Sequence, residues 1–146
     1  MFGSGGREAT PGDAAASVEL QLTALLAIAE RGCELQERAE AVLRRCAGTE
    51  HPDPSVAREG GYIAGEYHRL HGWAADAERA GAVDALHRQV ALLMMQHCML
   101  VHYAVRMAFP KSAHRPPGQN PISPELGDPA RRLRASRDEL TRLLSS

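Results

Sequence analysis

The clearest pattern in the chain is an uncharged, mostly apolar run with the sequence QVALLMMQHCMLVHYAV. It covers residues 89–105, between Arg88 and Arg106, and contains three of the five methionines. Residues 83–108 contain neither proline nor glycine, so we expect one continuous helix there. A helix that is apolar nearly all round lies either at the centre of a helical domain or in a membrane.

The length and polar content of this run favour the centre of a helical domain. Its 17 residues stand at the lower limit of what spans a bilayer, roughly 17–25. It also contains Gln96, His97 and His102, which are costly in hydrocarbon. We therefore predict no transmembrane segment. We expect His97 to lie in the core and to hydrogen-bond a neighbour.

Two further long helices are predicted before this run. The first begins at Asp13 or Ser17 and ends near Ala47. Its apolar residues recur at spacings of three and four, which predicts a seam against a partner helix; they are Leu25, Ile28, Gly32, Leu35, Ala39, Val42 and Cys46. Gly32 would permit a close approach.

The second helix is expected over residues 56–80, after the prolines of the segment GTEHPDP. Its predicted apolar stripe comprises Val56, Ile63, Tyr67, Leu70, Ala74 and Ala77, flanked by Tyr62 and Trp73. Four glycines weaken it, and a kink is expected near Gly60 and Gly61.

A fourth, shorter helix is predicted at the C-terminus, after a proline-rich linker at residues 110–128. Asp128 followed by Pro129 is a typical helix start, with Asp128 as the N-cap. Leu133, Leu140 and either Leu143 or Leu144 would share one face.

These elements predict an all-α fold: an antiparallel bundle of three long helices plus a shorter C-terminal helix. The bundle would cover residues 13–109, after a disordered tail at residues 1–12, and the basic amphipathic helix would cover residues 129–146. Hydrophobic residues make up 44% of the chain but aromatic residues only 4%, which favours close-packed helices over a sheet.

Charge and cysteine content narrow the choice of function. The net charge is -1, so the whole chain gives no reason to expect binding to nucleic acid or to an anionic membrane. Three cysteines without a CxxC motif are typical of a reducing cytoplasm rather than a disulfide framework. No nucleophile motif, phosphate loop or carboxylate pair is recognisable, so we predict a protein that is not an enzyme and has no cofactor.

One set of residues suggests an alternative function. Met94, Cys98 and His102 follow one another at intervals of four, which places thioether, thiol and imidazole on one helix face. Such a set suits copper(I) or haem, so a helical soft-metal or haem carrier is the alternative hypothesis. Methionine and cysteine at helical spacing also fill ordinary cores.

The C-terminal helix is the strongest electrostatic feature. Residues 129–146 contain five arginines and two acids, and the candidate partner-binding residues are Arg131, Arg132, Arg134 and Arg137. A basic amphipathic helix on a linker can dock on a protein partner, an anionic membrane or DNA. No helix-turn-helix signal is present, so a protein partner is preferred and sequence-specific nucleic-acid binding is not expected. In the other interpretation the leucines complete the bundle and the arginines are solvated.

The arginine- and alanine-rich bundle, the proline-rich linker and the QVALLMMQHCMLVHYAV helix resemble the plasmid spread proteins of conjugative plasmids in filamentous actinobacteria. The resemblance is one of overall character and carries no functional residues over. It implies a small non-catalytic accessory factor for plasmid spread, cytoplasmic and peripheral to the membrane. Its expected partner is the membrane-bound transfer machinery, and self-association is a further expectation.

Overall fold

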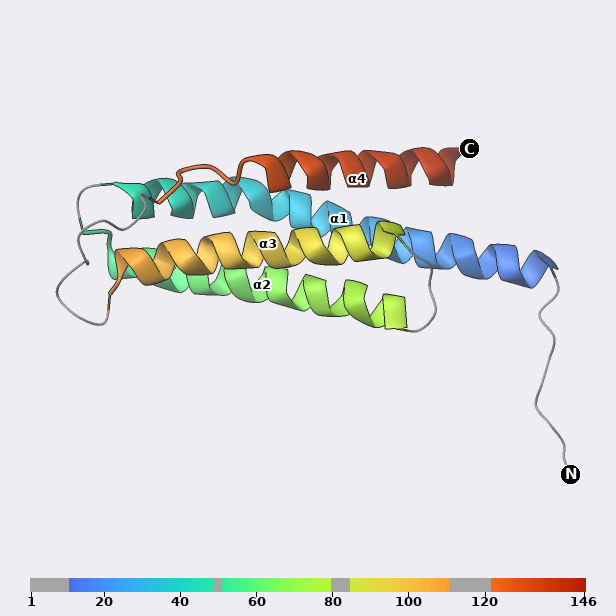
Figure 1. Ribbon diagram of the computed structural model, residues 1–146, viewed down its shortest axis with the longest axis horizontal. Helices are drawn as coiled ribbons and strands as arrows, with labels where there is room; N and C mark the ends of the chain where they lie inside the picture. Colours follow the sequence, from blue (N-terminus) through green and yellow to red (C-terminus); the bar gives the residue numbers. More distant parts are fainter. Residues whose placement is uncertain (1–10, 49–50, 80–84, 111–121) are drawn as a thin grey trace, which may run out of the picture.

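The chain forms a four-helix bundle in which successive helices alternate in direction (Figure 1). The structure, a computed structural model, describes residues 11–48, 51–79, 85–110 and 122–146. Its helices are α1 (Pro11–Ala47), α2 (Pro54–Arg79), α3 (Ala85–Ala108) and α4 (Asp128–Ser145). The predicted all-α bundle is confirmed. Helix α1 already includes Pro11 and Gly12, the last two residues of the tail predicted at residues 1–12. Residues 1–10 of that tail, residues 80–84 after α2 and residues 111–121 of the predicted linker lie outside the described residues.

The four helices do not pack equally. Helix α1 contacts each of the other three, and α2 packs along α3. Helix α4 lies on α1 and α3 and has no contact with α2 among the described residues. Helix α1 is also the longest, with 37 residues against 26 in α2, so its N-terminal end projects beyond the other helices (Figure 1).

The apolar patterns read from the sequence form the core. Every residue of the predicted α1 seam is buried except Ile28, which is partly buried. In α2 the stripe is buried from Val56 to Ala74. Gly32 permits the expected close approach, since a Cβ at this position would lie 2.5 Å from Met94 Cε on α3 and 3.0 Å from Leu133 Cδ2 on α4.

Helix α2 is continuous through Gly60 and Gly61, so the expected kink does not interrupt it. Gly60 is buried, and a Cβ there would overlap Val105 Cγ2 of α3 and lie 3.2 Å from Val42 Cγ1 of α1. The lack of a side chain at Gly60 therefore allows α2 to lie close to both α1 and α3. A Cβ at Gly61 would meet nothing within 4 Å.

The start of α4 differs from the prediction. The N-cap is Gly127 rather than Asp128, with a φ of 70° that favours glycine. Asp128 is instead the first helical residue, where its carboxylate accepts a hydrogen bond from Arg131 at 2.6 Å. Just upstream, Leu126 is buried and its N–H donates to Glu40 Oε2 at 3.1 Å, which ties this segment to α1.

Candidate functional site

A layer of polar side chains crosses the middle of the bundle and joins all four helices. The Nε2 amide of Gln36 donates to His97 Nε2 and to the carbonyl oxygen of Ala130, each at 3.2 Å. Gln36 Oε1 accepts from Arg134 at 2.9 Å. Tyr67 stacks at a tilt on His97, with ring centroids 4.9 Å apart, and its hydroxyl donates to the carbonyl oxygen of Gly32 at 2.8 Å.

The hydrogen bonds of this layer fix the protonation state of His97. Its Nδ1 lies 2.6 Å from the carbonyl oxygen of Leu93, which can only accept, so Nδ1 carries the proton. Nε2 is then the acceptor for Gln36. Burial lowers the pKa of His97, and the charge of Arg134 lowers it further, against the opposing effect of the Leu93 hydrogen bond. His97 is therefore neutral at pH 7.

The polar layer positions helices and offers no route to a substrate. His97 and Tyr67 are fully buried, and the polar atoms of the Gln36 amide all have partners. A satisfied buried network specifies which helix faces meet, while an unsatisfied one would cost stability. The predicted placement of His97 in the core, hydrogen-bonded to a neighbour, is confirmed.

The three residues of the alternative metal hypothesis lie in different environments. Met94 is fully buried, Cys98 is half-buried and His102 is exposed. Each step of four advances about 40° around the helix, so exposure increases from Met94 through Cys98 to His102. Burial also raises the pKa of the Cys98 thiol, which disfavours the thiolate that binds metals. Within the described ranges, no three His, Cys, Asp or Glu side chains are grouped to hold a metal ion.

The four candidate arginines of α4 occupy different environments. Arg134 belongs to the polar layer, and Arg131 is paired with Asp128. Arg137 is partly buried and contacts Asp138 at 3.2 Å, and Arg132 is exposed. Two of the four arginines are thus paired with acidic residues of α4 itself.

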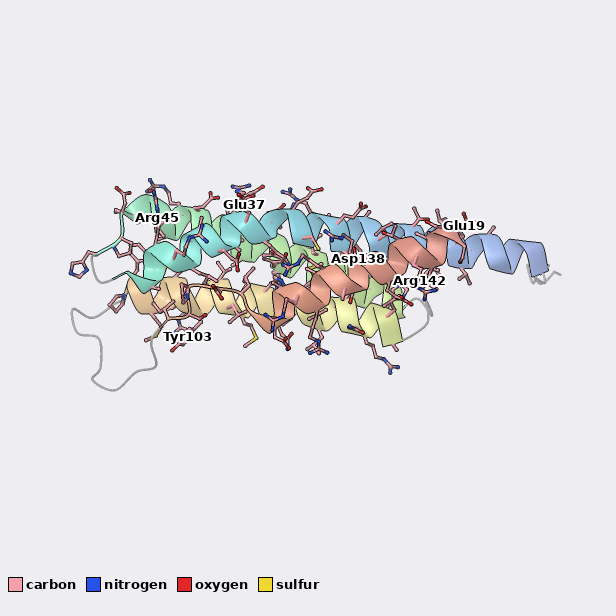
Figure 2. The ribbon with its side chains drawn as sticks, turned by 90° about the horizontal axis from the view of Figure 1, so that it is seen from above. Glu19, Glu37, Arg45, Tyr103, Asp138 and Arg142 are labelled. Atoms are coloured by element: carbon pink, nitrogen blue, oxygen red, sulfur yellow. The ribbon has the colours of Figure 1, made fainter. Side chains whose placement is uncertain are left out.

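Helix α4 is the fourth helix of the bundle and packs on α1 and α3. Its buried face consists of Ala130, Leu133, Ser136 and Leu140. Of the predicted apolar face, only Leu143 is exposed. Charged side chains of α4 such as Asp138 and Arg142 lie on the outside of the bundle, as do Glu37 and Arg45 of α1 (Figure 2).

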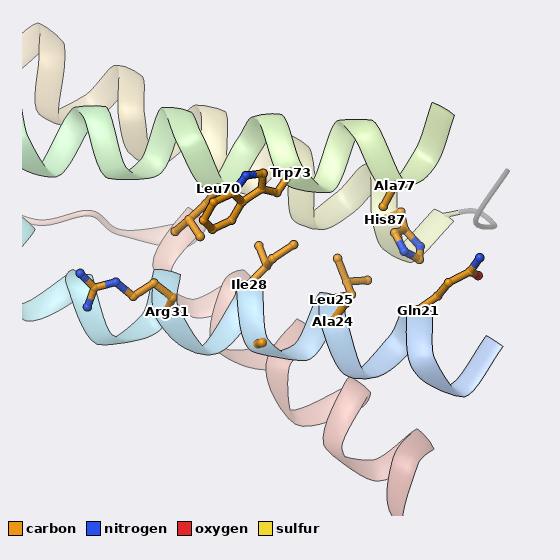
Figure 3. A pocket seen from close by; sticks show the side chains of 10 residues that line it. Gln21, Ala24, Leu25, Ile28, Arg31, Leu70, Trp73, Ala77 and His87 are labelled. Carbon is orange, nitrogen blue, oxygen red and sulfur yellow. The ribbon is translucent and has the colours of Figure 1, made fainter. Parts of the chain in front are cut away.

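An apolar cleft of about 480 Å³ lies between α1 and α2 (Figure 3). It lies at the end of the bundle where α2 finishes. Three alanines leave the space, and Trp73 stands at its edge with 53% of its surface exposed. The lining residues are Gln21, Ala24, Leu25, Ala27, Ile28, Arg31, Leu70, Trp73, Ala77 and His87. This cleft was not predicted from the sequence, although Trp73 beside the α2 stripe was a signal for it.

A second apolar surface lies on the outer side of α3. Leu92, Met99 and Tyr103 are 53%, 62% and 45% exposed. Nine other α3 residues are buried inside the bundle. Helix α3 is long and apolar enough to cross a membrane. Core helices of soluble proteins can have the same length and hydropathy.

Comparisons with protein-family models, with curated proteins and with solved structures give no match to this chain.

Proposed function

We propose that the protein is a non-catalytic interaction module that binds an apolar helix in the cleft between α1 and α2. The cleft itself supports this proposal. It is lined mainly by aliphatic side chains and bordered by a half-exposed tryptophan. Amphipathic helices dock in such grooves, and tryptophan is enriched among residues that dominate binding energy.

The environment of the other chemistry-bearing residues agrees with a non-catalytic role. The one buried imidazole of the polar layer is shielded and neutral, and burial raises the pKa of the Cys33 and Cys98 thiols. The arginines of α4 are committed to the bundle or to local ion pairs, apart from Arg132. The cleft is therefore a better candidate for partner binding than α4.

The resemblance to plasmid spread proteins gives the finer proposal. The module would serve as an accessory factor in conjugative plasmid spread, in the cytoplasm at the periphery of the membrane. Helix α3 would act as the core helix of this domain rather than as a membrane span, because nine of its residues face the other helices.

A photo-crosslinking amino acid placed at Ile28 tests the interaction role in cells. Ile28 lines the cleft, whereas Glu37 is on the outer side of the same helix and gives a matched control (Figures 2 and 3). We expect a discrete polypeptide adduct from position 28 that is absent from position 37. Equal labelling from both positions, or no polypeptide adduct from position 28, would contradict the proposal.

A further inference from the structure

Helix α1 carries an N-terminal extension, residues 11–20, that lies outside the four-helix core. The described side chains of this segment are exposed, with Val18 at 49% and Leu20 at 71%. An isolated helical segment of this length is marginal in water and gains stability from a packing partner. On the side of the extension that faces α4, Val18 and Glu19 border a hollow with Leu143 and Leu144. Leu20 does not line this hollow and is 71% exposed.

Leu20 lies on the same face of α1 as the cleft. Leu20, Ala24, Ala27 and Arg31 follow at spacings of four, three and four, which makes them one row along the helix. The last three of these line the cleft, and Leu20 continues the row beyond it. The apolar surface of the cleft and that of the extension are therefore continuous.

The cleft side of α1 also has the form of a hole for a single apolar side chain. Ala24, Ala27, Ile28 and Arg31 stand at positions i, i+3, i+4 and i+7, the four positions that surround one knob in knobs-into-holes packing. The two alanines leave room at its centre. A leucine from an antiparallel helix is the expected occupant.

We propose that the helix bound in the cleft is the N-terminal part of α1 around Leu20 from a second copy of this chain. In an antiparallel pair of α1 helices with a two-fold axis near residues 23 and 24, each Leu20 meets the hole of the other copy. With this axis about residues 16–26 of each copy lie over residues 21–31 of the other, so one symmetric contact covers both clefts and closes as a dimer. This inference rests on the function proposed above, since it names the partner of the same cleft.

The extent of the contact fits a reversible dimer. The extension and the part of α1 lining the cleft are each about 15 Å long at 1.5 Å per residue. Two helices of about 10 Å diameter, each half-covered in its groove, bury about 1,000 Å² in total. This area is at the lower end for specific complexes, so we expect a dissociation constant of the order of micromolar.

Sedimentation velocity of the full chain over a range of concentrations tests the dimer. The wild type should pass from monomer to dimer, and Leu20→Asp should weaken association at least tenfold without affecting the fold, because Leu20 is exposed in the monomer. Leu92→Asp is the control, an equally drastic change at an exposed leucine on α3. If Leu92→Asp abolishes the dimer and Leu20→Asp does not, the interface is on α3 and this inference is wrong.

A crosslink between isotopically distinct chains locates the contact. Light chains with photo-leucine at position 20 are mixed with heavy wild-type chains, and we expect mixed-isotope products joining position 20 to the segment from Gln21 to Arg31 or to α2. Crosslinks within single chains only, or a monomer at every concentration, would overturn the second-copy inference. If the photo-crosslinking amino acid at position 28 captured a different polypeptide in cells, the proposed interaction role would be supported and only the second-copy inference would be wrong. If position 28 captured no polypeptide, both the interaction role and the second-copy inference would be contradicted.

Discussion

Gly60 and Gly61 are neighbours in one helix, and the structure predicts opposite effects when each is replaced by alanine. Gly60 is buried where α2 meets α1 and α3, and a Cβ there would overlap Val105 Cγ2 and press on Val42. Gly61 is exposed, and a Cβ there would meet nothing within 4 Å. The two substitutions are otherwise chemically identical.

The expected magnitudes follow from two opposing effects. Replacing glycine by alanine inside a helix contributes about 1 kcal/mol of stability at either position. At Gly60 this is opposed by overpacking against a β-branched side chain with a stiff χ1, which costs about 1–3 kcal/mol. Gly61→Ala should therefore stabilise the fold by about 1 kcal/mol, whereas Gly60→Ala should be about neutral or destabilise it by up to about 2 kcal/mol.

Thermal unfolding followed by circular dichroism measures the difference. For a domain of this size 1 kcal/mol corresponds to about 3–4 °C, so the two variants should differ in Tm by about 3–12 °C, with Gly61→Ala higher. Urea unfolding of the same variants gives the free energies independently. Equal Tm values, or a more stable Gly60→Ala, would refute the close packing of α2 on Val105.

Three further predictions concern the core. The unfolding free energy of the wild type should decrease as the pH falls below 6.5, because His97 binds a proton more readily in the unfolded chain than in the folded core. In urea titrations at several pH values, His97→Gln should reduce this dependence of the unfolding free energy on pH. Leu93→Asp should abolish cooperative unfolding, because it puts an unpaired charge at a site that is 1% exposed. Deletion of residues 129–146 should lose the near-ultraviolet dichroism of the folded chain, whereas changing Arg131 and Arg132 to alanine should leave it intact, since both side chains are exposed.

The helices and their buried faces could be predicted because they follow from local periodicity. The α1 seam repeats over three heptads, and the α2 stripe has the same spacing, so each pattern identifies its own buried face. The α4 leucines identified a buried face too. They did not show whether α4 docks on the bundle, which depends on the tertiary contacts of Leu133 and Leu140.

The polar layer and the cleft could not be predicted from the sequence, because each is formed by side chains of different helices that come together only in the folded bundle. Gln36 and Arg134 read as surface residues in isolation and become a pair only when α4 packs on α1. The cleft arises where α1 and α2 leave space between small side chains at Ala24 and Ala77. Met94 is buried and His102 is exposed, a difference that the equal spacing of four did not predict.

The emission of Trp73 tests most directly whether a helix covers the cleft. Trp73 is the only tryptophan in the chain and half of it is exposed at the edge of the cleft, so its fluorescence reports on this site alone. As the wild-type protein is concentrated, the emission should shift to shorter wavelength and become less accessible to acrylamide. Leu20→Asp should show neither change. An emission spectrum and a quenching constant that stay the same at every concentration in both proteins would contradict the covered cleft.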